Sequence, residues 1–415
     1  MNRIYKNIFS LTLIQFFNYL SPLLVLPYLS RTLSIDGFGL LMLTISMISI
    51  CLVITDFGFN ISSTHWISIN RDDKNKVANH IGAVLVIKLI LIFFLIFILY
   101  YYIKYITELP IKDKNSYIIL VSLIVIFQSF QPTWFFQGIE RMFNITIFMA
   151  TSKIFYIILV FLLVKDKNDI TTTLICLLTS NIIASVLSLV SIYLNKYFIK
   201  LPPLSYTIQI LKIGIPYFFS RASVSVYTSA STFIVGSLSG LHQSAIFSSA
   251  EKLYQAGQSI TSPVSQAIFP YIAKTGEKNI LYKFIAIISI PLLMLCIACL
   301  LLSKEIITIF YGDSFYEAYP VLNIFIICTL INFIGVNFGY PAFAVFNRLD
   351  IPNKTTIVGF FVQIFSLLYL FRTDNISAYT VACSVLLTET IVMIIRVCLY
   401  LMIVKKEKKQ PNVKN

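Results

Sequence analysis

Apolar runs of about 20 residues follow one another along the whole chain, and the polar segments between them are short. Such a run is long enough to cross the hydrocarbon layer of a bilayer as a helix. Hydrophobic residues make up 58% of the chain and charged residues 12%, so a water-soluble fold would lack the polar surface to cover its core. The runs are continuous rather than alternating, which indicates helices rather than barrel strands. The predicted fold class is an all-α integral membrane protein.

Twelve runs are predicted to be transmembrane helices. They lie at about 8–30, 38–60, 80–103, 117–139, 145–164, 170–194, 208–238, 243–273, 282–303, 319–345, 354–372 and 378–403. The most polar segment between them, 195–206, divides the runs into two groups of six. An even number in each group gives both the same orientation, which is typical of a parallel repeat about an axis normal to the membrane. We therefore expect an N-terminal six-helix lobe at 1–206, a C-terminal six-helix lobe at 207–404 and a basic cytoplasmic tail at 405–415.

Two loops support the repeat at the level of sequence. Phe136–Asn144 follows the fourth run and Phe346–Asn353 follows the tenth, and both are short and contain an acid and an arginine. Their equivalent positions in the two groups are those that a six-plus-six repeat requires.

Positive charge is distributed unevenly across the predicted membrane. With both termini on one side, 19 of the 32 lysine and arginine residues lie on that side and 8 on the other. The positive-inside rule makes the richer side cytoplasmic. Much of the formal charge of +14 then reflects topology, and the run Lys405–Lys409 is interpreted as a membrane-surface anchor. No basic folded module is present, so nucleic acid is not an expected partner.

The loops and the cysteines exclude other classes of function. No loop is longer than about 20 residues, whereas membrane glycosyltransferases and glycan polymerases usually carry a large external loop with acidic catalytic residues. Cys296 and Cys299 have the spacing of a redox pair, but they lie in an apolar helix that favours packing. The three histidines are scattered. We predict no catalytic residue, no metal site and no cofactor.

Polar side chains concentrate in two predicted spans, 208–238 and 243–273. In the first span Arg221, Ser225, Thr228 and Thr232 share one helix face. The second span carries a stripe made of Glu251, Gln255, Gln258, Ser262 and Gln266. Such stripes cannot face lipid tails, so they face water or each other. Bends or breaks are expected at the prolines within spans, which are Pro22, Pro27, Pro132, Pro216, Pro263 and Pro270.

Charged side chains inside the membrane are the candidate functional residues, because each costs roughly 2.5 kcal/mol or more. The candidate substrate-binding residues are Arg221, Lys252, Lys153 and Lys88, and the candidate ion-coupling residues are Glu251 and Glu389. Arg396 and Asp56 lie near the ends of spans and are interpreted as boundary residues. A basic surplus suits an anionic substrate, and the many hydroxyl and amide groups suit a sugar-like moiety.

Four motifs resemble those of O-antigen flippases of the Wzx type, which belong to the multidrug/oligosaccharidyl-lipid/polysaccharide exporter superfamily. They are Pro27–Gly39, Asp56–Asn60, Trp134–Met142 and Leu211–Phe218. The resemblance implies two six-helix lobes around a central cavity. It also implies a transporter, not an enzyme, that moves an undecaprenyl-pyrophosphate-linked oligosaccharide from the cytoplasmic to the periplasmic leaflet of a bacterial inner membrane by ion-coupled alternating access. Membrane lipid and other polysaccharide assembly proteins are the further partners expected.

Two alternatives stay open at this point. A drug or small-solute exporter of the same superfold would share the topology but should have a less basic cavity. A membrane glycosyltransferase or polymerase would belong to a different class, against which the short external loops argue.

Overall fold

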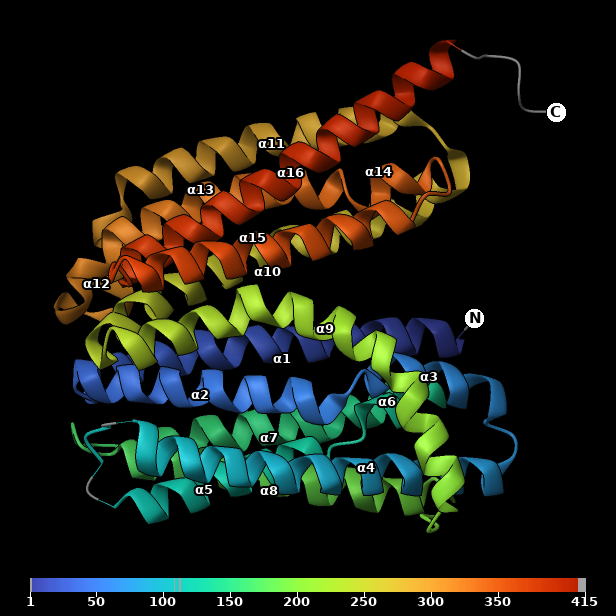
Figure 1. The fold of residues 1–415 in the computed structure, drawn as a ribbon, viewed down its shortest axis with the longest axis vertical. Helices are drawn as coiled ribbons and strands as arrows, with labels where there is room; N and C mark the ends of the chain where they lie inside the picture. The colour runs from blue at the N-terminus through green and yellow to red at the C-terminus, as the bar shows by residue number, and fades with distance from the viewer. Residues whose placement is uncertain (1, 108, 112, 410–415) are drawn as a thin grey trace. The chain divides into compact units, whose positions relative to one another are not determined.

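The computed structural model describes residues 2–107, 109–111 and 113–409, although several side chains in α1, α9, α10 and the end of α16 are outside the description. Within these ranges the regular secondary structure is entirely helical (Figure 1). This agrees with the all-α fold class expected from the continuous apolar runs. The chain forms two compact units, Met1–Ser225 and Val226–Asn415.

The first unit contains eight α-helices, one π-helical turn and the beginning of α9. They are α1 (Asn2–Thr32), α2 (Ile35–Asp56), α3 (Phe59–Asn70), α4 (Lys74–Tyr101), η1 (Tyr102–Ile106), α5 (Lys114–Ser129), α6 (Thr133–Gly138), α7 (Met142–Leu163), α8 (Ile170–Leu194) and α9 (Leu204–Leu238). Helix α7 packs against α1 and α8, and α5 packs against α2 and α8. Helix α9 continues into the second unit, so the boundary between the units falls inside it. The lobe boundary at 206 stays a prediction.

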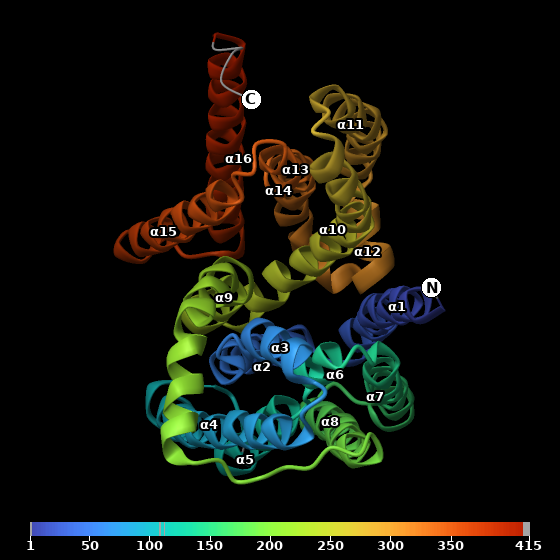
Figure 2. The same cartoon turned by 90° about the vertical axis from the view of Figure 1, so that its right-hand side faces the viewer.

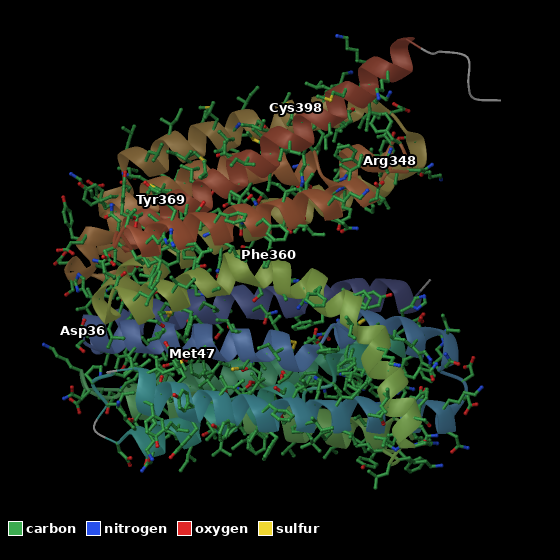
Figure 3. All side chains as sticks on the ribbon, in the orientation of Figure 1. Asp36, Met47, Arg348, Phe360, Tyr369 and Cys398 are labelled. Carbon is green, nitrogen blue, oxygen red and sulfur yellow. The ribbon has the colours of Figure 1, made fainter. Side chains whose placement is uncertain are left out.

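The second unit contains the rest of α9 and the helices that follow. They are α10 (Leu241–Thr275), α11 (Lys278–Leu301), α12 (Ser303–Tyr311), the 3₁₀ turn η2 (Asp313–Ala318), α13 (Tyr319–Asn337), α14 (Tyr340–Ala344), α15 (Asp350–Arg372) and α16 (Ala378–Lys409). Helix α13 packs against α10, α11 and α16, and so occupies the centre of this group (Figure 2). Arg348 and Tyr369 mark the two ends of α15 in Figure 3.

Nine helical segments of the described residues are long and apolar enough to cross a membrane. They are α2–α3, α4–η1, α5–α6, α7, α8, α11, η2–α14, α15 and α16. The chain therefore forms a multi-pass membrane protein. Helices α1, α9 and α10 are 31, 35 and 35 residues long and lie where the other three spans are predicted. Twelve crossings stay a prediction.

Two membrane segments end in the same way, at equivalent places in the predicted repeat. The long helices α5 and α13 are each followed by a break and then by a short helix, α6 or α14. Each short helix ends in a Schellman motif, with Glu140 or Asn347 at positive φ. The next residue, Arg141 or Arg348, donates its backbone N–H to the carbonyl of a phenylalanine five residues earlier. This geometry aligns Phe136 with Phe343, whereas the sequence comparison above begins its second loop at Phe346.

Prolines and glycines place the breaks. Pro132 lies between α5 and α6, as predicted, whereas α1 runs through Pro22 and Pro27 as one helix. Helix α9 bends in Figure 1, and Pro216 is its internal proline. The break between α2 and α3 has no proline. There Phe57 and Gly58 both adopt positive φ, and the Phe57 ring stacks on Phe218 of α9 at 4.9 Å.

Basic loops lie together at one end of each unit. In the first unit Arg71, Lys74, Arg141 and Lys196 line one cavity of about 570 Å³, although they come from three separate loops. In the second unit Lys278, which begins α11, lies over the ring of Phe346, 4.9 Å from its centroid. Each grouping joins loops that the charge pattern assigns to the cytoplasmic side, so the helix packing is consistent with the predicted topology.

The segment that leads into α9 packs directly on α4. The backbone N–H of Lys200 donates to the carbonyl of Ala78 at 3.2 Å, and the Lys200 ammonium donates to Asn75. Gly82 makes this approach possible, because a Cβ atom there would overlap the Lys200 carbonyl oxygen. Since the obstacle is backbone, a larger residue at position 82 must displace the segment.

We therefore expect Gly82→Ala to destabilise the protein by roughly 1–3 kcal/mol, the usual cost of overpacking. The matched control is Gly257→Ala in α10, where a Cβ atom would make only ordinary contacts with Thr329 at 3.7 Å or more. Because alanine favours a helix over glycine by about 1 kcal/mol, the control should hold or gain stability. Thermal unfolding in detergent measures both variants. Equal melting temperatures for Gly82→Ala and the wild type would contradict the close packing.

Candidate functional site

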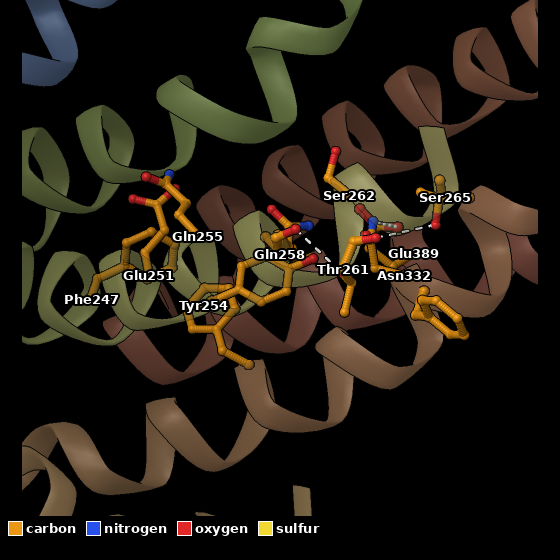
Figure 4. A pocket seen from close by; sticks show the side chains of 14 residues that line it. Phe247, Glu251, Tyr254, Gln255, Gln258, Thr261, Ser262, Ser265, Asn332 and Glu389 are labelled. Atoms are coloured by element: carbon orange, nitrogen blue, oxygen red, sulfur yellow. Dashed lines mark hydrogen bonds between the residues drawn. The ribbon is translucent and has the colours of Figure 1, made fainter. Parts of the chain in front are cut away.

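The second unit contains a polar cavity of about 280 Å³ between α10, α13 and α16. Its polar lining consists of Glu251, Gln255, Gln258, Thr261, Ser262, Ser265, Asn332 and Glu389, together with the ring of Tyr254. Figure 4 shows Glu251 and Gln255 toward one end of this row and Ser262, Ser265 and Glu389 toward the other. On α10 the row extends from Glu251 to Ser265, about 21 Å along the axis at 1.5 Å per residue. The cavity is therefore an elongated groove of amide, hydroxyl and carboxyl groups.

Helix periodicity correctly predicted the α10 side of this cavity. Four members of the predicted stripe, Glu251, Gln255, Gln258 and Ser262, line it together. The fifth, Gln266, has a side chain outside the described residues, as does Thr228 of the predicted α9 face. Of that second face, Arg221 is exposed and Thr232 is buried.

Both candidate ion-coupling carboxyls lie in this cavity, and each has a polar partner. The Glu251 side chain is 7% exposed, and its Oε2 accepts a hydrogen bond of 2.7 Å from the Thr232 hydroxyl of α9. Glu389 accepts a bond of 3.1 Å from the Asn332 amide of α13. The structure thus places two acids that are 138 positions apart in the sequence along one cavity, toward its opposite ends. Among the described residues each carboxyl has one such partner, and a carboxyl inside the membrane can bind a proton or a cation.

The lining of the cavity is acidic rather than basic. It contains two carboxyl groups and, among the described residues, no lysine or arginine. Lys252 is half-buried beside it and donates to the Gln255 side-chain oxygen at 3.0 Å. Two cations interact electrostatically with the acids, Lys252 with Glu251 and Arg396 with Glu389. The basic surplus expected from the sequence is therefore not found in the lining of this cavity.

The first unit buries a separate group of charged residues. Lys88 of α4 is 3% exposed and donates its ammonium to the carbonyl of Ser129 at 2.7 Å. It interacts electrostatically with Asp56, at the end of α2, and so does the exposed Arg221 of α9. The carbonyl of Ser129 is available because α5 ends there, just before the break at Pro132. Helix ends thus supply the acceptor that a lysine inside the membrane requires.

Asp56 is the centre of this group rather than a boundary residue. It is 8% exposed, and its Oδ1 accepts a bond of 2.6 Å from Asn60. Asn60 accepts in turn from Thr133 of α6 at 2.8 Å. Among the described residues no hydrogen bond to its buried Oδ2 is found. The interpretation of Asp56 as a boundary residue missed that Phe57 and Gly58 end α2 inside the bundle, where both adopt positive φ.

The other intramembrane bases occupy different settings. Lys153 is half-buried on α7, the helix that packs between α1 and α8. Arg396 of α16 donates to the carbonyl of Gly335 on α13 and to the hydroxyl of Thr355 on α15, both at 2.9 Å. Arg396 therefore joins three helices and is a structural cross-link, not only a residue that reaches toward the membrane surface.

Asn332 was not identified from the sequence. Helix α13 carries two other asparagines, Asn323 and Asn337, but neither lies three or four positions from Asn332, so no stripe forms. Only the fold shows that Asn332 faces Glu389. Gln363 of α15 was also not identified from the sequence. It is buried against α16 and bonds with Ser384 and Thr388. An amide side chain within an apolar span is the signal that could have found both, because burial without a partner is costly.

The sequence matches one protein family and two curated proteins. Residues 4–276 match the family described as "Polysaccharide biosynthesis protein". A protein of Shigella dysenteriae is 33% identical over 276 residues, which are 65% of this chain and 67% of its own length. A protein of Escherichia coli (strain K12) is 28% identical over 277 residues, 66% of each chain. Both carry the name "Putative O-antigen transporter".

Solved structures share the fold. A multidrug resistance MATE family transporter of the MOP superfamily, in its inward-facing conformation, gives a TM-score of 0.71 at 15% identity and covers 97% of this chain and 99% of its own. The lipid II flippase MurJ, in an inward closed conformation, gives a TM-score of 0.69 at 14% identity and covers 97% of this chain and 87% of its own. These matches confirm the superfamily fold that the four motifs indicated.

Proposed function

The chain belongs to the polysaccharide biosynthesis protein family, and from that premise we propose that it is an O-antigen flippase. It moves undecaprenyl-pyrophosphate-linked oligosaccharide repeat units from the cytoplasmic to the periplasmic leaflet of a bacterial inner membrane. The observation that carries this proposal is the family match over residues 4–276, together with two curated relatives named as O-antigen transporters. Their names describe transport, which supports a transporter rather than a glycan-synthesising enzyme.

The polar cavity supports a role in passing sugar through the membrane. A sugar presents hydroxyl groups that must keep hydrogen-bond partners when they leave water. Gln255, Gln258, Thr261, Ser262 and Ser265 offer both donors and acceptors along one side of the cavity. Amides and hydroxyls can rearrange their hydrogen bonds, so such a surface tolerates several sugar orientations.

Arg221 is the proposed contact for the pyrophosphate. Its guanidinium is exposed within the first unit, whereas the ammonium of Lys88 is buried against the Ser129 carbonyl. A guanidinium can donate two parallel hydrogen bonds to a phosphate, which an ammonium cannot do. Lys252 and Lys153, both half-buried, are further candidate contacts, and Lys88 is a candidate only in a conformation that exposes it.

Glu251 and Glu389 are the proposed ion-coupling residues. Both line one cavity, each accepts a hydrogen bond from a described residue, and each has a cation that interacts with it. Binding of a proton or a metal cation would neutralise one acid and change the balance with Lys252 or Arg396. A change in charge that alters the relative stability of two conformations is the physical requirement for coupled alternating access.

A drug or small-solute exporter is the second candidate, and the acidic lining of the cavity favours it. Two carboxyls and several aromatic rings suit an organic cation. The MATE fold is consistent with this possibility. The family match favours the flippase, and the two functions differ in what fails when the protein is altered: surface glycan for the flippase, resistance to cationic compounds for the exporter.

Arg221→Ala should block surface glycan while protein levels stay normal. Loss of charge-assisted hydrogen bonds to pyrophosphate should weaken binding by roughly 2–3 kcal/mol, or about 30- to 150-fold. Arg221→Gln should behave in the same way, and Arg221→Lys should restore part of the function. Glycan is measured on intact cells of a strain that depends on this gene, and protein is measured in the membrane fraction.

Two other arginines serve as references for this experiment. Arg372→Ala removes an exposed arginine at the end of α15 and should leave glycan normal. Arg396→Ala removes the cross-link between α13, α15 and α16 and should lower the amount of folded protein. Full surface glycan from a well-expressed Arg221→Ala variant would exclude the binding role.

Glu251→Gln and Glu389→Gln should reduce export and weaken its dependence on pH. Glutamine keeps the shape of the side chain and can still accept from Thr232 or Asn332, but it stays neutral at every pH. Glu305→Gln, at an exposed position in α12, is the matched control. Export is measured in membrane vesicles across a range of pH values. A pH profile unchanged from the wild type would remove that glutamate from the coupling role.

A further inference from the structure

A second cavity lies directly beside the polar one and is almost entirely apolar. It has a volume of about 210 Å³ and is enclosed by α10, α11, α12 and α13. Its apolar lining includes Leu253, Leu292, Leu295, Cys296, Leu322 and Ile326. The two cavities share Tyr254, Thr261 and Phe325 in their linings, so they adjoin each other.

Helix α11 forms the outer wall of this apolar cavity. The buried side chains of α11 include Leu292 and Cys296, and both line it. Leu295 also lines it, yet remains 54% exposed, and Cys299 is partly exposed. In Figure 2, α11 stands at the edge of the second unit. Lining side chains of α11 therefore also reach a surface that a bilayer would cover.

A glycine contributes to the space in this cavity. Gly257 of α10 lines it, and a Cβ atom at that position would come no closer than 3.7 Å to Thr329. The backbone there is helical and does not require glycine, so the missing side chain leaves space rather than relieving strain. Glycine in a helix costs about 1 kcal/mol relative to alanine. Helix stability alone would favour alanine at position 257, so it does not explain the space that the glycine leaves.

We propose that this apolar cavity holds the isoprenoid chain of the lipid-linked substrate, next to its pyrophosphate, while the polar cavity holds part of the sugar. The inference rests on the proposed flippase function and adds where the lipid part of the substrate binds. A lipid-linked oligosaccharide is polar at one end and apolar at the other, and adjoining cavities of opposite polarity match that order. The volume suits the first isoprene units and not the whole chain, which remains in the bilayer.

The cavity would fix the position of the isoprenoid chain and would add little to the affinity for the substrate. Lipid tails are as apolar as leucine, so moving a chain from the bilayer into the cavity gains little hydrophobic free energy. A chain anchored between α10 and α11 would instead fix the depth of the attached head group beside Gln255 and Gln258. The methyl branches of an isoprenoid also fill an irregular cavity differently from a straight acyl chain, which gives a basis for discriminating against phospholipid.

Photo-crosslinking in proteoliposomes tests the proposal. The probe is an undecaprenyl-pyrophosphate-linked oligosaccharide with a diazirine in the isoprene units nearest the pyrophosphate, and crosslinked residues are mapped by mass spectrometry. We expect crosslinks on the cavity wall, at Leu295, Cys296 and Cys299. A phospholipid with a diazirine at matched depth should give clearly lower yields there. Cys398 of α16, which is exposed and outside the cavity, reports general contact with lipid.

A side chain introduced at position 257 should fill the cavity and lower the yield of these crosslinks, and a larger side chain should lower it more. Gly257→Leu should lower their yield by roughly ten-fold, the scale expected when one or two methylene groups exclude a ligand from an apolar pocket, and Gly257→Ala should lower it less. Met294→Phe adds bulk to the exposed face of α11, at a residue outside the cavity lining, and should leave the yield unchanged.

The outcomes separate the two proposals. Crosslinks spread over the outer face of α11, equal labelling by the phospholipid, or no effect of Gly257→Leu would each overturn the tail site, and so would absence of crosslinks from a protein that transports the substrate. Failure of the wild-type protein to bind or transport any lipid-linked oligosaccharide would instead overturn the proposed function.

Discussion

The hydrocarbon layer contains no water to satisfy polar groups, and the arrangement of this protein follows from that constraint. Every polar side chain within the spans must find a partner in the bundle or line a cavity. The chain uses both solutions. Arg396, Gln363 and Lys88 are paired with acceptors on neighbouring helices, whereas the stripe from Glu251 to Ser265 lines open space. Within that stripe Glu251 and Gln255 also accept hydrogen bonds, from Thr232 and Lys252, so the polar face is held by its neighbours while it lines the cavity.

Breaks in the helices also provide hydrogen-bond partners inside the membrane. A helix that ends inside the bundle leaves carbonyl and amide groups without partners in the helix. At the end of α5 the carbonyl of Ser129 meets the ammonium of Lys88, and at the end of α2 the carboxyl of Asp56 is held by Asn60. The broken helices therefore create the places where charge can be kept within the membrane. At the end of α5 the bond from the Lys88 ammonium gives the Ser129 carbonyl a partner that the helix does not supply.

Sequence periodicity predicted the elements that depend on local order. Glu251, Gln255, Gln258 and Ser262 share a face because a helix has a fixed pitch, and they line one cavity for that reason. Pro132 broke its span because proline cannot donate an amide hydrogen bond. The meeting of Glu389 with Asn332, and of Arg396 with Gly335 and Thr355, depends on how three helices pack, and nothing local encodes it. The break at Phe57 and Gly58 was missed because it depends on close packing against Gly214 and Phe218 of α9.

Movement of a lipid-linked oligosaccharide across a sealed bilayer by the purified protein is the central claim, and reconstitution measures it most directly. The protein is placed in liposomes with an undecaprenyl-pyrophosphate-linked oligosaccharide, and a membrane-impermeant glycosidase reports how much sugar is exposed outside. A flippase should expose the sugar that starts in the inner leaflet, well above liposomes without protein, and a cationic dye should not compete. Exposure equal to that of protein-free liposomes would contradict the flippase function.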